Sequence, residues 1–250
     1  MKRVAAAFIL FTRLPLWRWV SPSQEAYSDA VVFWPLVGWL TGGVTALCLL
    51  LFSCVMPWLP AVVLSMVLRL LLTGALHEDG LADFCDAFGC GGDKARILSI
   101  MKDSHIGTYG VLGLIFYALM MVSLLASLPP YVAACTVFAA DPFSKFCAGQ
   151  LTNFLDYARP EGAKNRISYS RMNWSRLLVQ ALFGLLPLGV LCSVSPELCI
   201  AAVLPLVTLL FLSWMMRKKI GGYTGDCCGA TFLLCELSMV LGICVLLPLI

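Results

Sequence analysis

Three aspartates between residues 77 and 86 have the spacing of one helix face. Asp79, Asp83 and Asp86 are separated by four and three residues, so on a helix their side chains fall within about 60° of one another. Like charges at this spacing repel, which is unfavourable unless a cation lies between them. Mg²⁺ prefers carboxylate oxygens together with the phosphate oxygens of a substrate. The spacing therefore favours a metal site for phosphate chemistry over a solvated acidic helix end.

Further candidates for chemistry lie close to these three aspartates, which are called the acidic stripe below. His77 falls on the opposite side of the same helix, and a lone histidine there is more often structural than a base. At the end of the same loop, Asp103 offers another carboxylate, while Lys102 and His105 offer positive charge. Two glycines follow and allow close backbone approach to a ligand. We count His77 and Asp103 as candidate catalytic residues and Lys102 as a candidate substrate ligand.

Two more segments combine positive charge with aromatic residues or glycine. The segment 152–176 has five Lys and Arg residues and several aromatic rings, which could hold a nucleotide diphosphate and stack a base. Taken alone, it is also explained as an ordinary positively charged cytoplasmic loop. The segment 217–227 runs from three cations through glycines into a helix, whose N-terminus favours anions. The candidate substrate-binding residues here are Arg159, Arg166, Arg217, Lys218, Thr224, Gly225 and Asp226.

Four ionisable residues interrupt otherwise apolar stretches. Charges inside a membrane are costly, so they should face the protein interior and pair. Asp141 and Lys145 are four residues apart and could neutralise each other. Arg69 and Glu236 each lie about 12–15 Å from the same end of their helices, which predicts a second pair. Glu236 is also a candidate substrate-binding residue.

The elements that position these residues are predicted to be membrane helices. The chain has 250 residues, of which 60% are hydrophobic and 12% charged, against about 25% charged in a soluble domain. About 20 apolar residues cross a bilayer as a helix, because the backbone must satisfy its own hydrogen bonds there. We expect an all-α, polytopic transmembrane bundle forming a single integral membrane domain over residues 1–250. About seven crossings fit, at 31–56, 58–76, 108–128, 131–151, 177–194, 198–216 and 228–249.

Charge predicts the orientation of the bundle. Three short connections contain proline and no Lys or Arg, whereas the segments 77–107, 152–176 and 217–227 carry most of the charge. Fifteen of the seventeen Lys and Arg residues are then cytoplasmic together with the N-terminus, as the positive-inside rule requires. The segment 4–19 is too short to cross, and its arginines and tryptophans favour an interfacial or re-entrant segment.

Taken together and in order, these motifs resemble the cobalamin synthase family, the bacterial adenosylcobinamide-GDP ribazoletransferases. The resemblance rests on segments 77–83, 102–110 and 224–226 with Glu236, and extends to 11–15 and 33–38, so that it covers nearly the whole chain. Three positions depart from the usual pattern: Ala87 replaces a glycine, and His105 and Lys145 replace arginines. None of these departures changes an acidic residue.

The resemblance implies a reaction. The family joins α-ribazole, or its 5′-phosphate, to adenosylcobinamide-GDP, which releases GMP and forms adenosylcobalamin or its phosphate. It implies Mg²⁺ as cofactor, held here by Asp79, Asp83 and Asp86, and a multi-pass protein of the bacterial inner membrane with a cytoplasmic active face. Its expected partners are the two small-molecule substrates and the lipid bilayer, without nucleic acid, and further copies of the chain are compatible with it. Phosphoryl transfer needs mainly positioning and charge neutralisation, which an acidic stripe and basic loops can supply.

Other functions are compatible with parts of the pattern. A transporter with an ion path through the buried charges would place its site near the membrane midplane and would often carry inverted repeats; the chain has no repeat, and its densest acidic cluster lies at the interface. A phosphatidyl-type phosphotransferase also uses clustered aspartates, but its usual pattern has arginine where Asp83 follows Ala82. A non-catalytic membrane subunit is the third alternative.

Overall fold

Every regular element in the described part of the chain is a helix. The computed structural model describes residues 1–159, 169 and 171–249, and within these ranges it contains one isolated bridge, between Tyr157 and Tyr223, but no strand. The predicted all-α class is confirmed. The longer helices are α3 (Trp34–Ser53), α4 (Trp58–Thr73), α5 (Leu76–Cys90), α7 (Thr108–Ser127), α8 (Pro130–Gly149), α10 (Trp174–Leu185), α11 (Val203–Ile220) and α12 (Gly225–Leu246).

Shorter helices extend or connect these elements. The short α-helices are α1 (Lys2–Phe11), α2 (Gln24–Ser28), α6 (Lys94–Ile100) and α9 (Leu151–Phe154). The 3-10 helices are η1 (Leu16–Arg18), η2 (Ala30–Phe33), η3 (Leu186–Ser193), η4 (Pro196–Ala202) and η5 (Leu247–Leu249). Proline in the first turn of α3, α8, η3 and η4 fits this pattern, because the first helical N–H groups have no partner within the helix.

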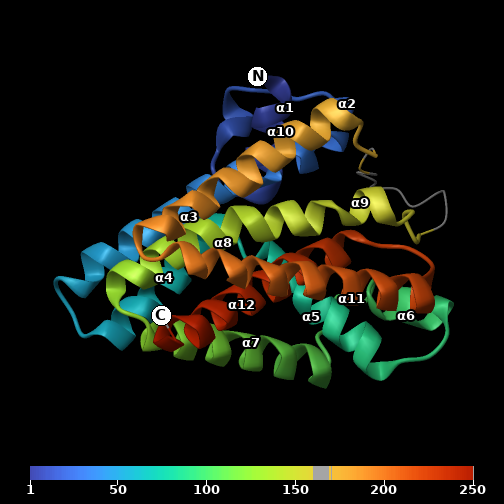
Figure 1. Cartoon of the computed structure of the whole chain (residues 1–250). Coiled ribbons are helices and arrows are strands. Elements are labelled where there is room, and N and C mark those ends of the chain that lie inside the picture. The colour runs from blue at the N-terminus through green and yellow to red at the C-terminus, as the bar shows by residue number, and fades with distance from the viewer. Residues whose placement is uncertain (160–168, 170, 250) are drawn as a thin grey trace.

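Helix α8 forms the centre of the bundle, between α3 and α12 (Figure 1). Glycines let α3 approach it closely: a Cβ atom at Gly38 would lie 2.7 Å from the Cα atom of Pro142, and one at Gly42 would lie 3.0 Å from Cβ of Asp141. Small residues four apart are a common device for tight packing of membrane helices. Because α8 is enclosed, its polar residues face protein instead of lipid.

The helices include several that could cross a membrane. Five segments among the described residues are long and apolar enough, and a sixth is added if α4 and α5 count as one broken span. This makes the chain a multi-pass membrane protein. Helix α8 is not among the five; it carries Asp141 and Lys145, which are both buried by its neighbours. The number of seven crossings and the cytoplasmic side of the N-terminus stay predictions.

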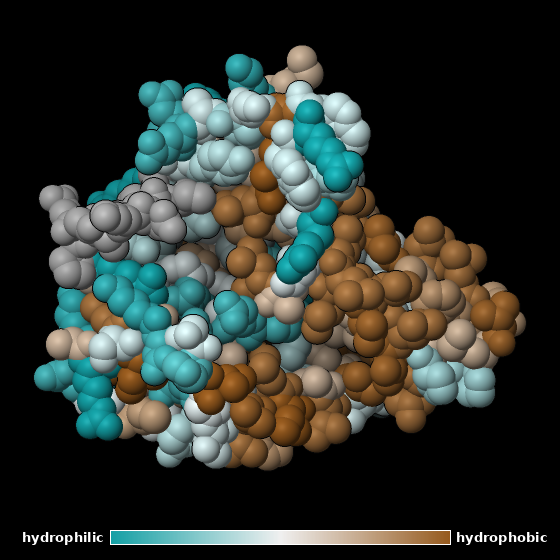
Figure 2. Space-filling model, turned by 180° about the vertical axis from the view of Figure 1, so that it is seen from behind, coloured by the Kyte–Doolittle hydropathy of each residue, from teal (hydrophilic) through white to brown (hydrophobic). Residues whose placement is uncertain are grey.

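Polar and apolar surfaces are separated along the bundle. Figure 1 shows the C-terminus at the same end as the α3–α4 and α7–α8 turns, with α5, α6 and α9 at the opposite end. Figure 2 shows mostly apolar surface toward the first end and hydrophilic surface toward the second. The residues predicted to do chemistry therefore gather mainly at one end of the molecule.

A sharp bend separates α4 from α5 and places the acidic stripe. Gly74 and Ala75 both have left-handed backbone conformations, with φ of 70° and 59°, and the helix axes on either side differ by 92°. Glycine adopts this conformation readily. The backbone N–H of Arg13 donates to the carbonyl of Leu72 at 2.8 Å, which ties the N-terminal segment to the bend. Since α5 carries four acidic residues, we place it outside the spans, along the end of the bundle.

The ionisable residues inside the bundle form one network. Arg69 donates to both oxygens of Glu236, at 2.7 and 2.6 Å, and Lys145 pairs with Asp141. Both predicted pairs are confirmed. The Nε atom of Arg69 also lies 3.7 Å from Oδ2 of Asp141, and the hydroxyl of Thr41 donates to the same carboxylate at 2.8 Å. The two pairs are therefore joined across α4, α8 and α12.

Candidate functional site

The site begins where α5 crosses the N-terminus of α12. A Cβ atom at Gly80 would lie 3.1 Å from the Cα atom of Asp226, and one at Gly229 would lie 3.2 Å from the carbonyl oxygen of His77. Only glycine permits backbones this close without displacement. As a result, Asp79 and Asp83, on either side of Gly80 in α5, come near Asp226 of α12.

The carboxylates of this cluster affect one another electrostatically. Asp83 is half-buried, and burial followed by the charges of Asp226, Asp79 and Asp86 raises its pKa to about 6, opposed by Arg159. A raised carboxyl pKa means that the charged form is unfavourable in these surroundings. The cluster carries more negative charge than Arg159 offsets, so a further cation would stabilise it.

The N-terminus of α12 offers the opposite charge beside this cluster. Thr224 caps the helix by accepting the N–H of Cys227 at 3.3 Å, and Gly225 is exposed, with open space where a side chain would be. Arg159 donates to Asp226 at 2.8 Å. Free N–H groups at a helix start, together with a guanidinium, suit an anion such as a phosphate.

Asp86 has a different role from the other two aspartates of the stripe. Its side chain is 5% exposed, and its two oxygens accept the backbone N–H groups of Gly107 at 2.7 Å and Gly110 at 2.8 Å. The backbone of Gly107 and Gly110 lies against this carboxylate, whereas the sequence predicted that it would lie against a ligand. Asp86 thus fastens the N-terminus of α7 to α5, and it is a positioning residue in this geometry.

We expect Asp86→Asn to lower stability more than any other Asp→Asn substitution in the stripe. The amide can accept only one of the two N–H groups, and a buried hydrogen bond to a charged group contributes about 1.5–3 kcal/mol. The measurement is a melting curve in detergent, with Asp79→Asn as the matched control, since Asp79 is exposed. Equal melting temperatures for the two variants would contradict the capping role.

Two other predicted residues are buried in the protein interior. His77 is 3% exposed and packs against Trp34, Phe11 and Phe232. It also lines one cavity together with Asp79 and Asp226, but its aromatic contacts favour a structural role. Glu236 is fully buried and bound to Arg69, away from the loop residues with which it was grouped. Its prediction as a substrate ligand has no geometric support here.

The remaining loop residues are mostly engaged locally. His105 donates its backbone N–H to Asp103 at 3.0 Å, and hydrogen bonds from His105 lower the pKa of Asp103 in an exposed turn. Lys102 is exposed. Arg217 donates to the carbonyl of Phe154 at 2.8 Å. Lys218 lies 5.2 Å from the ring centroid of Trp214, and Arg166 falls outside the described residues.

Two cavities meet at Asp79. The smaller, about 150 Å³, lies between α5, α12 and the N-terminal segment and is lined by Asp79, Asp226 and Gly225 among others. The larger, about 470 Å³, lies between α4, α5 and α7. Its polar lining includes Glu78 and Tyr117, which sequence reasoning missed: Glu78 adjoins the acidic stripe, but a tyrosine within an apolar helix gives no signal.

The cluster suits a hard divalent ion without forming a complete cage. Within the part of the chain that the structure describes, no three His, Cys, Asp or Glu side chains converge as ready metal ligands. Mg²⁺ is commonly bound by one or two carboxylates with water and substrate phosphates supplying the other ligands. Asp79, Asp83 and Asp226 offer such carboxylates beside an anion site, so the residues fit Mg²⁺ bound together with a phosphate.

Comparison with known proteins identifies relatives over nearly the full length. A family model described as cobalamin-5-phosphate synthase matches residues 3–244. A protein of Ralstonia pickettii (strain 12J) is 35% identical over 93% of this chain and 91% of its own length. One of Leptospira interrogans is 32% identical over 97% and 95%, and one of Shewanella oneidensis is 36% identical over 91% and 87%.

These three relatives carry the name adenosylcobinamide-GDP ribazoletransferase. No solved structure matches the chain. The family model covers most of the chain and reaches from α1 to α12, so it includes every element that contributes to the carboxylate cluster. The chain belongs to the cobalamin-5-phosphate synthase family.

Proposed function

We propose that this protein is an adenosylcobinamide-GDP ribazoletransferase. It joins α-ribazole, or its 5′-phosphate, to adenosylcobinamide-GDP and releases GMP. Family membership supports the reaction, since the relatives of similar length carry this name. The observation that carries the proposal in this chain is the juxtaposition of Asp79 and Asp83 with Asp226 at the open N-terminus of α12.

Each part of this arrangement has a task in phosphoryl transfer. Arg159 and the first N–H groups of α12 bind charged oxygens of the diphosphate. A hydroxyl of the ribazole then attacks the phosphorus nearer the cobinamide and releases its proton to solvent. A new P–O bond forms, and the bond from this phosphorus to the bridging oxygen breaks as GMP leaves. Such reactions depend mainly on positioning and on stabilising charge.

Mg²⁺ dependence is part of the proposal. Asp79, Asp83 and Asp226 would hold the ion, which when bound would neutralise the diphosphate and the departing phosphate. Burial first, and then the charges of Asp226, Asp79 and Asp86, raise the pKa of Asp83 to about 6, and the charge part of this shift supports the assignment because a bound cation would offset it. Arg159 pairs with Asp226 and offsets one of the three negative charges, so the ion would neutralise the charge that remains on the cluster.

The proposed location is the bacterial inner membrane, with the site facing the cytoplasm. The positive-inside rule supports this orientation, because the segments 77–107, 152–176 and 217–227 contain most Lys and Arg residues. The carboxylate cluster is built from the first and third of these segments. Substrates present in the cytoplasm would then reach the site without crossing the membrane.

The reaction is tested with purified protein in detergent supplied with adenosylcobinamide-GDP, α-ribazole and Mg²⁺. We expect GMP and a cobalamin product in equal amounts, and neither when the ribazole is omitted. Asp83→Asn serves as the inactive control. The absence of GMP with both substrates present would overturn the proposed function. GMP release without ribazole would show that the protein hydrolyses adenosylcobinamide-GDP and is not a transferase.

A further inference from the structure

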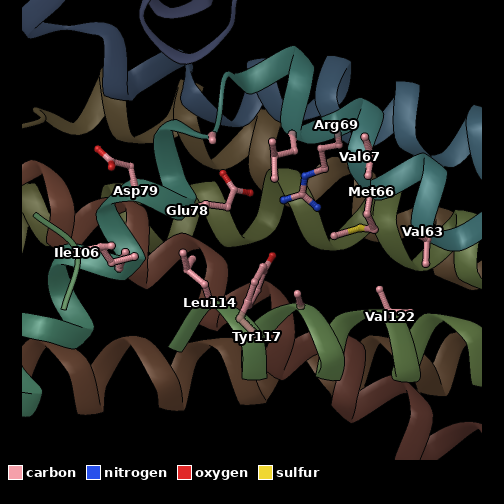
Figure 3. A pocket seen from close by; sticks show the side chains of 14 residues that line it. Val63, Met66, Val67, Arg69, Glu78, Asp79, Ile106, Leu114, Tyr117 and Val122 are labelled. Atoms are coloured by element: carbon pink, nitrogen blue, oxygen red, sulfur yellow. The ribbon is translucent and has the colours of Figure 1, made fainter. Parts of the chain in front are cut away.

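The larger cavity has the size and lining of a ligand pocket. It measures about 470 Å³, within the range of about 300–1,000 Å³ for small-molecule sites. Figure 3 shows its wall, to which α4 contributes Val63, Met66 and Val67 and α7 contributes Leu114 and Val122. Most of the cavity therefore offers apolar contact only.

Two buried polar atoms at one end of this cavity have no hydrogen-bonding partner among the described residues. Tyr117 is 6% exposed, and neither its hydroxyl nor Oε2 of Glu78 has a partner among the described residues. Figure 3 shows the Tyr117 hydroxyl directed toward Glu78 and Arg69 at the cavity wall. Arg69 is already bound to Glu236. Buried polar atoms are normally paired, so these two point to a ligand with polar groups at this end.

The polar end adjoins the carboxylate cluster. Asp79 lines this cavity and also the smaller cavity that contains Asp226 and Gly225. A ligand whose apolar part fills the larger cavity would present its polar part to the place where the diphosphate is proposed to bind. Such a placement would direct a nucleophilic hydroxyl of the ligand toward the diphosphate.

We propose that this cavity binds the aromatic base of the acceptor nucleoside, with the sugar directed toward Asp79. The assignment rests on the proposed function. The base supplies a flat apolar body, and a ring nitrogen accepts a hydrogen bond from the Tyr117 hydroxyl. A sugar hydroxyl donates to Glu78. Both unpartnered atoms are then satisfied, and the apolar walls contact the ring.

Two alternative ligands, guanine and a lipid acyl chain, fit the lining of this cavity less well. Guanine carries several donors and acceptors along its edges, and an apolar cavity would leave most of them unpaired at a cost. A lipid acyl chain would match the walls but would leave the Tyr117 hydroxyl and Glu78 without partners. The base of the ribazole combines an apolar body with few polar atoms, as the cavity requires.

The test narrows the cavity and compares two kinetic constants. Leu114→Trp fills space inside the cavity, and Leu112→Trp is its matched control, because Leu112 lies in the same helix, is 43% exposed and does not line the cavity. We expect Leu114→Trp to raise the KM for α-ribazole at least about ten-fold, the scale of a steric pocket effect. The KM for adenosylcobinamide-GDP should stay within about two-fold, and Leu112→Trp should change neither constant.

A second variant removes the polar contact and keeps the shape. Tyr117→Phe should raise the KM for α-ribazole about five-fold, the effect of one lost hydrogen bond, and should weaken α-ribazole binding in equilibrium dialysis with Mg²⁺. This variant carries the test if Leu114→Trp does not fold. An unchanged KM and unchanged dialysis for well-folded variants would overturn the assignment.

The outcomes also separate this inference from the proposed function. If wild-type protein makes GMP and the ribazole KM is unaffected by both substitutions, only the pocket assignment fails. If wild-type protein makes no GMP and binds no α-ribazole, both fail. Phospholipid that copurifies with wild type but not with Leu114→Trp, with an unchanged ribazole KM, would assign the cavity to a lipid chain and overturn the proposal.

Discussion

Asp83→Asn is expected to lower turnover by about 10²–10³-fold, the scale of losing one group that stabilises transition-state charge, while the protein remains folded. Asparagine nearly preserves the shape of the side chain but removes the charge that a metal ion requires. Asp83 is half-buried beside Asp226 and Asp79, so removing its charge also relieves repulsion. In metal-free buffer the melting temperature should therefore be unchanged or slightly raised.

The same residue predicts a pH dependence with a defined sign. Its pKa is raised to about 6 in the folded protein, against about 3.9 in an unfolded chain. The folded protein therefore holds this proton more tightly, so the contribution of Asp83 to stability is present below about pH 4 and is lost as pH rises toward 6. Asp83→Asn should flatten this part of the metal-free stability profile.

Melting curves between pH 4 and 7 and rates of GMP release measure both effects. Asp93→Asn is a suitable control, because Asp93 is exposed and caps α6 by accepting the N–H of Arg96 at 2.9 Å, a role that asparagine also fills. Turnover of Asp83→Asn within a few-fold of wild type would contradict a part for Asp83 in the site.

Arg69→Leu is expected to destabilise the folded protein by about 3–5 kcal/mol, the cost of breaking a buried ion pair from one side. Glu236 is fully buried and accepts both of its Arg69 hydrogen bonds within 2.7 Å. Removal of Arg69 would leave this carboxylate, and in part Asp141, without its cation. The measurement is thermal unfolding in detergent, monitored as the loss of monodisperse protein.

A double variant separates charge from packing. Arg69→Leu combined with Glu236→Leu removes both charges, so it should recover part of the stability lost by Arg69→Leu alone, because an uncompensated charge costs more than an absent pair. Leu70→Ala is a control on the same helix, since Leu70 is 40% exposed. A double variant no more stable than Arg69→Leu would contradict the ion-pair explanation.

The sequence predicted the fold to the extent that the bilayer constrains it. Apolar length and the cost of buried charge led to an all-α bundle and to the pairs of Arg69 with Glu236 and of Asp141 with Lys145. It did not predict that the pairs merge or that α8 lies at the centre, because both depend on which helices pack together. The close approach of α3 at Gly38 is visible only in three dimensions.

The acidic residues of the candidate site were predicted from the sequence, but the different roles of these residues were not. Spacing placed Asp86 with Asp79 and Asp83, yet its oxygens bind the start of α7, 21 and 24 residues further along the chain. Asp226 comes near α5 because Gly80 allows backbone contact, which periodicity cannot reveal. Tyr117 was missed because a tyrosine in an apolar helix is ordinarily a packing residue.

The proposed Mg²⁺ site consists of Asp79, Asp83 and Asp226 beside the bound diphosphate. It is tested most directly by GMP release from adenosylcobinamide-GDP and α-ribazole across an Mg²⁺ titration, in wild-type protein and in Asp79→Asn. We predict no release in EDTA, saturation with Mg²⁺ in wild type, and a half-saturating Mg²⁺ concentration at least about ten-fold higher in the variant. Equal release in EDTA and in Mg²⁺, or identical titrations for the two proteins, would contradict it.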